Sequence, residues 1–201
     1  MITIVDYGMG NLGSIQNMLK RIGVPAEVTG EVATLERASK ILLPGVGAFD
    51  SAMERINASG LRAVLDRKAL QERVPIMGIC LGMQLLTRSS EEGQLPGLGW
   101  IAAATRRFPA APGFKVPHMG WNVVTAARDS PLTEGLPIES RYYFVHSYYV
   151  QADDARDSLL TTHYGVTFDA AISHGNLYGA QFHPEKSHKF GMRFLANFAR
   201  I

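Results

Sequence analysis

The chain has 201 residues, of which 46% are hydrophobic, and its formal net charge is +2. This length and composition predict one globular domain, residues 1–201, with a sizeable apolar core. Charges of both signs are interspersed without a basic stripe, and no apolar run reaches the roughly 18 residues that span a bilayer. Nucleic acid and membranes are therefore not expected as partners.

The only cysteine of the chain cannot form an internal disulfide. The first residues, MITIVDYG, predict an apolar strand and lack the basic start and cleavage site of a secretory signal. Both features favour a reducing compartment, and we expect a cytoplasmic protein.

The first half of the chain alternates short β-branched runs with amphipathic helical segments, which is typical of βαβ units in a parallel sheet. The apolar run at residues 74–79 predicts a buried central strand. The other strands are predicted at 2–6, 26–29 and 41–45, and the helices at 12–23, 35–40, 48–57 and 60–72.

From residue 93 to about 140 the helical period fades, and Pro and Gly separate strand-like pieces. This pattern predicts antiparallel strands added to the parallel sheet, or long functional loops, with strand-like pieces at 99–108 and 114–124. Further strands are expected at 141–150, 158–165, 169–175 and 177–183, before a final helix at 189–201.

A glycine pattern near the N-terminus, Gly8-x-Gly10-x-x-Gly13, matches the spacing of the dinucleotide-binding fingerprint. That fingerprint requires an acidic residue at the end of the second strand, whereas Glu27 comes near the beginning of its strand. The pattern is equally compatible with a tight turn that leaves Asn11 exposed.

Cys80 lies between a predicted strand and a predicted helix, in the spacing Gly78-x-Cys80-x-Gly82 of a nucleophile elbow. The glycines leave room where strand and helix pass closely, so we expect a strained backbone and an exposed thiol at the bend. The N–H groups at the start of the following helix favour the thiolate. An inert, buried cysteine is the alternative.

His183 is the histidine that a carboxylate most clearly supports, because Glu185 follows two residues later in the run FHPEKS. Pro184 biases His183 toward an extended backbone, so both side chains should project to the same side. Glu185 would then orient the imidazole as the third member of a catalytic triad. A surface turn is the alternative for this motif alone, and His146 is a further histidine that could face a cleft.

Two backbone segments are candidates for holding a negatively charged oxygen. The amide of Leu81 follows the nucleophile directly, and the turn Pro44-Gly45-Val46-Gly47 follows a strand. The same turn could be a plain tight turn. Scattered histidines and one cysteine show no metal-ligand spacing, so no metal is expected.

The runs GICLGMQLL, LPGVGAF and FHPEKS resemble the class I (triad) glutamine amidotransferases over essentially the whole chain. DYGMGNLGSI, PHMGWN and YYFVHSYYV are similar to the glutaminase subunits of imidazole glycerol phosphate synthases. The resemblance implies a flavodoxin-like α/β fold with a mostly parallel sheet, helices on both faces and additional antiparallel strands.

The resemblance also implies an activity and a partner. Glutamine would be hydrolysed to glutamate and ammonia without a cofactor, and the ammonia would pass to a (β/α)₈ cyclase subunit in histidine biosynthesis. It further implies substrate contacts at Gly47, Gln84, Glu92, Ser147 and Tyr148, and cyclase contacts at Asn11, Trp121, Tyr143 and Lys186.

Some of these assignments have alternatives from the residues alone. Gln84 lies one helical turn beyond Cys80 and could face solvent, and Trp121 and Tyr143 could pack in the core. The elbow does not separate this pathway from other ammonia-using synthases, such as those of anthranilate or pyridoxal phosphate. A nucleotide-binding oxidoreductase module and a non-catalytic subunit are the alternatives from other classes.

Overall fold

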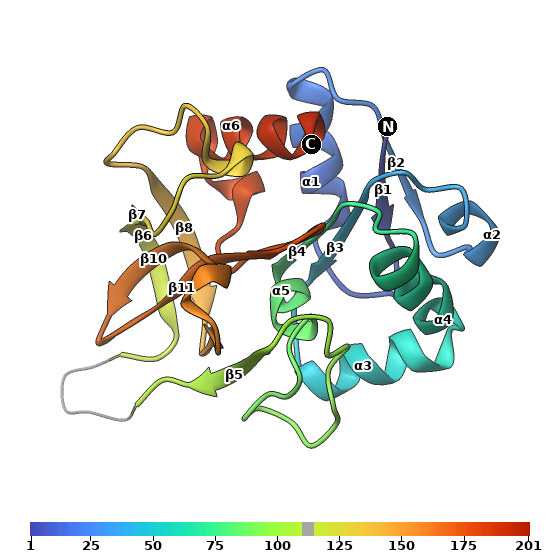
Figure 1. Cartoon of the computed structure of the whole chain (residues 1–201), viewed down its shortest axis with the longest axis horizontal. Coiled ribbons are helices and arrows are strands. Elements are labelled where there is room, and N and C mark those ends of the chain that lie inside the picture. The colour runs from blue at the N-terminus through green and yellow to red at the C-terminus, as the bar shows by residue number, and fades with distance from the viewer. Residues whose placement is uncertain (110–114) are drawn as a thin grey trace.

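The computed structural model describes residues 1–109 and 115–201, in which helices cover both faces of a mixed β-sheet (Figure 1). Among these residues, five neighbouring parallel strands form the centre of the sheet in the order β2-β1-β3-β4-β12. This is the flavodoxin-like order, as expected. The strands span Ile2–Val5 (β1), Ala26–Thr29 (β2), Ile41–Gly45 (β3), Ile76–Cys80 (β4) and Leu177–Ala180 (β12).

Antiparallel strands extend the sheet beyond β12, as the second half of the sequence predicted. β11, β10 and β7 follow in that order, while β9 pairs with both β11 and β5. β6 and β8 form a separate two-stranded sheet. These strands span Ala103–Arg107 (β5), His118–Val123 (β6), Thr125–Ala126 (β7), Arg141–His146 (β8), Tyr148–Ala152 (β9), Ser158–Tyr164 (β10) and Val166–His174 (β11).

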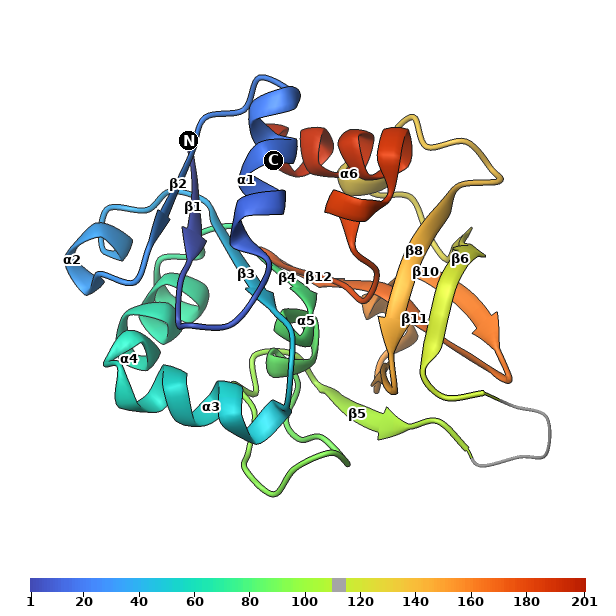
Figure 2. The same cartoon turned by 180° about the vertical axis from the view of Figure 1, so that it is seen from behind.

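The helices divide between the two faces of the parallel strands. α1 (Leu12–Arg21) and α6 (His188–Arg200) lie together on one face. Both helices can be followed in Figure 2, where the molecule is turned by 180° from the view of Figure 1. The other face carries α2 (Val32–Leu35), α3 (Phe49–Ala58), α4 (Leu61–Asp66) with the π-helical turn Arg67–Gln71, and α5 (Leu81–Leu85). Short 3-10 turns occur at Pro131–Thr133, Ala155–Asp157 and Pro184–Lys186.

Continuous apolar runs in the central strands follow from this layered arrangement. In β3, Ile41 and Leu43 pack toward the α3 and α4 side, whereas Leu42 packs toward α1 and α6. Because successive side chains of a strand point to opposite faces, a strand covered on both faces requires apolar residues at every position.

Several predicted elements were wrong in extent. The strands expected at 99–108 and 177–183 are shorter, spanning Ala103–Arg107 and Leu177–Ala180. The helix expected at 35–40 instead spans Val32–Leu35, because Lys40 already accepts a hydrogen bond from Thr3 of β1 and its backbone has joined the sheet. The strand expected at 141–150 breaks at Ser147 into β8 and β9, which pair with different strands. The first residue of the piece predicted at 114–124 lies outside the described residues.

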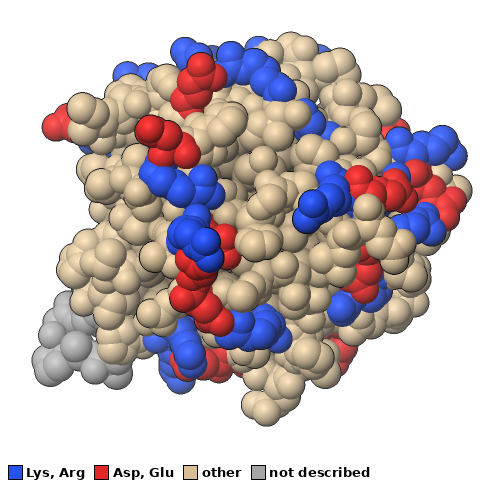
Figure 3. Space-filling view, viewed as in Figure 1, with Lys and Arg blue, Asp and Glu red and all other residues tan. Residues whose placement is uncertain are grey.

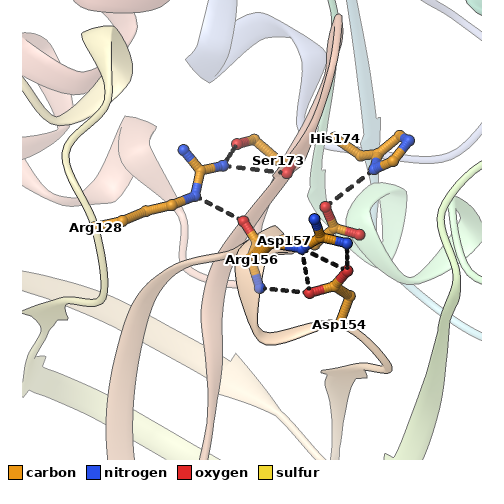
Figure 4. Close-up of polar contacts among 6 residues, drawn as sticks. All are labelled: Arg128, Asp154, Arg156, Asp157, Ser173 and His174. Atoms are coloured by element: carbon orange, nitrogen blue, oxygen red, sulfur yellow. Dashed lines mark hydrogen bonds and ion pairs between the residues drawn. The ribbon is translucent and has the colours of Figure 1, made fainter.

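A polar cluster fastens the turn before β10 to β11 (Figure 4). Arg128 donates from Nε to the carbonyl of Arg156 at 2.8 Å and from Nη2 to the carbonyl of Ser173 at 3.2 Å. His174 Nδ1 lies 3.0 Å from Asp157 Oδ1. The two bonds from Arg128 thus link the carbonyl of Arg156 in the turn Ala155–Asp157 to that of Ser173 in β11.

The surface shows no large area of one charge on the face in Figure 3, where basic and acidic side chains intermix. None of the helices in the described part of the chain is long and apolar enough to cross a membrane.

The close crossing of α5 over β3 gives a stability prediction. A Cβ atom on Gly82 would overlap the backbone carbonyl of Leu43, so Gly82→Ala should reduce the free energy of unfolding by about 1–3 kcal/mol in urea denaturation. Gly13→Ala is the matched control, because a Cβ there meets nothing within 4 Å and Gly13 lies in α1. That variant should be unchanged or more stable, and equal stability of both variants would contradict the prediction.

Candidate active site

Cys80 occupies the turn between β4 and α5 in a strained conformation, with φ +55° and ψ −111°. Residues other than glycine rarely adopt a positive φ, and such strain is found at functional sites. A Cβ atom on Gly78 would overlap the carbonyl of Gly82. The flanking glycines therefore let strand and helix pass at this distance, as the elbow spacing predicted.

The thiol of Cys80 is not exposed as the sequence predicted, because the residue is only 7% exposed. It opens instead into a cleft of about 380 Å³ whose walls come from segments far apart in the sequence. The predicted oxyanion and substrate residues all line this cleft, which is formed by Val46, Gly47, Cys80, Leu81, Gln84, Glu92, Pro117, Val145, His146, Ser147, Tyr148, His183 and Lys186.

A larger hollow of about 750 Å³ lies between α6 and residues 22–25. It contains neither the thiol nor an imidazole, although Lys40 and Arg193 line it. The smaller cleft is therefore the candidate site, because it alone of the two contains a nucleophile beside a base.

His183 follows β12 and is held from several sides. Its Nδ1 lies 2.8 Å from Glu185 Oε1, and both side chains are almost fully buried. Its N–H donates to the carbonyl of Tyr143 at 2.9 Å, and Ser187 Oγ donates to its carbonyl at 2.6 Å. His183 has the extended backbone that Pro184 predicted, with φ −99° and ψ 97°, and its expected pairing with Glu185 is present across the 3-10 turn Pro184–Lys186.

The electrostatic surroundings of His183 favour its charged form. Burial lowers the pKa of His183, but interactions with Cys80 and Glu185 outweigh burial and raise it to about 9. Nε2 of His183 and Oε2 of Glu185 are buried without a hydrogen-bond partner in the described part of the chain. The thiol of Cys80 thus affects the pKa of His183, although it forms no hydrogen bond of standard geometry with Nε2.

Gln181 is a neighbour of the thiol that sequence reasoning missed. It is fully buried, and its Nε2 donates to Cys80 Sγ at 3.7 Å. Gln84 Nε2 donates to Gln181 Oε1 and to the carbonyl of Tyr148, both at 3.1 Å. Both N–H groups of the Gln84 amide are then engaged, which leaves its oxygen as the atom available to a ligand. A glutamine inside the apolar run LYGAQF was the available signal.

The turn after β3 lies directly beside the thiol, because Gly45 and Cys80 are partners in the register of β3 and β4. Tyr7 Oη donates to the carbonyl of Pro44 at 2.8 Å and anchors the turn. Gly47 has φ +110°, a conformation that favours glycine. Val46 and Gly47 line the same cleft as Cys80 and Leu81.

Glu92 is an exposed carboxylate at the rim of the same cleft. It accepts a hydrogen bond from the backbone N–H of Phe49 at 3.0 Å, which caps the first turn of α3. Burial raises its pKa above the ordinary value, against the effect of that hydrogen bond.

Three of the four predicted interface residues lie together. Trp121 and Tyr143 are partners in the register of β6 and β8, with ring centroids 6.2 Å apart. Lys186 Nζ lies 5.8 Å from the centre of the Tyr143 ring. Asn11 is exposed at the start of α1, which packs against the turn Pro184–Lys186.

The glycine pattern near the N-terminus lacks the contacts of a nucleotide site. Gly13 does not pack closely against the sheet, since a Cβ there meets nothing within 4 Å. Glu27 lies in the middle of β2 and accepts a hydrogen bond from Thr3 Oγ1 at 2.9 Å. The described residues also contain no group of three or more His, Cys, Asp or Glu side chains arranged to hold a metal ion.

Comparison with known proteins identifies relatives of the whole chain. The family model for class-I glutamine amidotransferases matches residues 3–201. An imidazole glycerol phosphate synthase subunit HisH 2 from Methanococcus maripaludis is 52% identical, covering 100% of this chain and 99% of its own. The subunit HisH 2 from Pseudomonas aeruginosa is 49% identical, covering 100% of both chains. A crystal structure of a glutamine amidotransferase shares the fold, with a TM-score of 0.78 at 18% identity and full coverage of both chains.

The raised pKa of His183 predicts the pH dependence of this site. An NMR titration of the folded protein should place its midpoint near 9, and Glu185→Gln should lower that midpoint. The folded-state pKa exceeds the unfolded value of about 6.5, so the charged imidazole stabilises the fold fully below that pH. This contribution is lost as the pH rises through 9. A parent midpoint at or below 6.5 would contradict the predicted effect of Cys80 and Glu185 on the pKa of His183.

Proposed function

We propose that Cys80, His183 and Glu185 are the catalytic residues of this chain. The chain belongs to the class-I glutamine amidotransferase family, and within it to the HisH subunits of imidazole glycerol phosphate synthase. It is a glutamine-hydrolysing enzyme of that family. The single observation that supports this use of the site is the meeting of a strained elbow cysteine and a carboxylate-supported imidazole in one cleft.

Glutamine hydrolysis begins with attack by the sulfur of Cys80 on the carbon of the substrate's carboxamide. The resulting oxyanion is stabilised by the N–H of Leu81 and by N–H groups of the turn at Val46 and Gly47. The carbon–nitrogen bond then breaks, and His183 gives its proton to the departing ammonia. The product of this step is a γ-glutamyl thioester on Cys80.

The thioester is released by water in the second half of the reaction. His183, now neutral and held by Glu185, takes a proton from water as the oxygen attacks the thioester carbon. Collapse of the intermediate frees glutamate and restores the sulfur. Gly47, Gln84, Glu92 and the bend Ser147–Tyr148 bind the substrate, and the carboxylate of Glu92 suits the substrate's ammonium group. No step requires a cofactor.

The ammonia passes to a (β/α)₈ cyclase subunit, in the cytoplasmic synthesis of histidine. We place the docking surface for the cyclase subunit on the face of β6 that points away from the core. On this face Met119, Trp121 and Val123 are 62%, 44% and 49% exposed. Alternate residues of one strand lie on one face, so these three form an apolar row. Tyr143 and Lys186 border it beside the cleft, and Asn11 is the fourth proposed contact.

Replacement of the nucleophile tests the chemistry directly. Cys80→Ala and Cys80→Ser should abolish glutamine hydrolysis, because neither side chain supplies the attacking sulfur. Both variants should keep the thermal unfolding temperature and the partner affinity close to those of the parent. Glutamate release by the partner complex measures the first effect, and hydrolysis at the parent rate in either variant would refute the assignment.

The isolated chain should be nearly inactive, since ammonia released without the partner is wasted. We expect the turn at Val46 and Gly47 to present too few N–H donors until the cyclase and its ligand bind. The partner should then raise glutamine turnover by about 10²–10³-fold, the effect of one oxyanion donor. Full turnover by the purified chain alone would contradict this.

Trp121→Ala should weaken cyclase binding by about 2–4 kcal/mol in titration calorimetry, because buried aromatic anchors dominate interfaces. Leu70→Ala is the control, since Leu70 is an exposed apolar residue in the turn Arg67–Gln71 before β4, outside the proposed surface. Equal affinities of the two variants would rule out the proposed surface.

A further inference from the structure

Two buried imidazoles form a hydrogen-bonded chain that ends at the bend carrying Ser147 and Tyr148. His118 on β6 and His146 on β8 are partners in the strand register, and His118 Nδ1 lies 2.9 Å from His146 Nε2. His146 Nδ1 lies 2.7 Å from the carbonyl oxygen of Tyr148. Neither imidazole has a part in the chemistry proposed above.

The direction of the hydrogen bonds follows from the atoms at the inner end. A carbonyl oxygen only accepts, so His146 must donate from Nδ1 to Tyr148. Burial lowers the pKa of His118 to about 4 and that of His146 to about 3, so both rings are neutral at pH 7. A neutral ring carries one N–H, and Nε2 of His146 is therefore an acceptor. His118 must then donate to it from Nδ1.

At the other end of the chain, Asn122 beside His118 independently requires the same direction of hydrogen-bond donation. Asn122 Oδ1 accepts from the backbone N–H of Val123 at 2.9 Å, and Asn122 Nδ2 donates to the carbonyl of His163 at 3.0 Å. These two bonds fix the orientation of the amide. Its Nδ2 lies 3.3 Å from His118 Nε2, the one nitrogen of that ring left to accept. Every donor in the chain thus meets an acceptor.

Aromatic rings hold the two imidazoles in place. His118 stacks on Phe144 and Tyr164, with centroid distances of 4.7 and 4.1 Å and interplanar angles of 26° and 23°. Phe168 makes edge contacts with both imidazoles, at 5.9 Å from His118 and 5.3 Å from His146. A ring confined in this way is restricted in tilt, so its N–H direction is preorganised.

The carbonyl of Tyr148 is the point where this chain reaches the cleft. It accepts from His146 and from Gln84, whose other amide hydrogen reaches Gln181 beside the thiol. The backbone bends at Ser147, between β8 and β9, so a bond from His146 across to residue 148 holds the bend itself. The geometry of the cleft therefore depends on the two hydrogen bonds that Gln84 Nε2 and His146 Nδ1 donate to the Tyr148 carbonyl oxygen.

We propose that His118 and His146 are positioning residues for glutamine. As one directed relay of N–H donors from Asn122, they hold the Tyr148 carbonyl, the bend at Ser147 and the Gln84 amide in the arrangement that binds the substrate. This inference rests on the proposed function of the same cleft.

Matched variants of His118 test the relay in the complex with the cyclase subunit. His118→Phe keeps an aromatic ring but removes the donor to His146, and it should raise the KM for glutamine by about tenfold with little change in kcat. His118→Asn places an amide nitrogen where Nδ1 was and should restore most of the parent KM. His174→Phe, at an exposed histidine outside the cleft, should match the parent.

Nitrogen-15 NMR of the imidazoles supplies a second readout, which a merely structural role would not require. Both His118 and His146 should carry their hydrogen on Nδ1 and none on Nε2 at pH 7. An Nε2–H form of either ring would overturn the relay, as would an unchanged KM in folded His118→Phe. If that variant does not fold, Asn122→Ala should raise the KM by a smaller factor, and an unchanged KM would again overturn it.

The two proposals fail in different ways. A parent complex that hydrolyses no glutamine would overturn the proposed function and the substrate role of the relay with it. An active parent whose KM is insensitive to these variants would overturn the relay alone.

Discussion

The site depends on one steric constraint, the close passage of α5 over the ends of β3 and β4. Gly82 lies against the carbonyl of Leu43, and Gly78 lies against Gly82, so neither position has room for a side chain. The chain reverses between them at Cys80 with a positive φ. Packing of the surrounding core must outweigh this strain, which costs about 1–3 kcal/mol. The result places one sulfur at the carboxyl ends of parallel strands, where the turns after β3 and β12 also converge.

Buried polar groups around the sulfur form the second layer of the site. Gln84, Gln181 and the carbonyl of Tyr148 satisfy one another, and the imidazole of His146 completes the set. His183 differs from them, because its Nε2 is buried without a hydrogen-bond partner among residues 1–109 and 115–201. An unsatisfied donor in a low-dielectric site costs stability, and such a cost is repaid when a substrate or intermediate accepts its proton.

Sequence reasoning succeeded where a local rule decides the structure. The bounds of β3 matched because a strand buried on both faces is a continuous apolar run, and the elbow at Cys80 was found because its glycines report a local steric limit. The burial of the thiol was missed because distant segments build the walls of the cleft. The pairing of His118 with His146 was missed for the same reason, since antiparallel register is not visible in one strand.

The central claim, that Cys80 is the nucleophile which His183 serves, is tested most directly by trapping the covalent intermediate. The complex with the cyclase subunit is mixed with glutamine, quenched in acid during turnover, and digested for mass spectrometry. We predict a γ-glutamyl group on the peptide that contains Cys80. Turnover of glutamine with no such adduct, or with the adduct on another residue, would contradict the account.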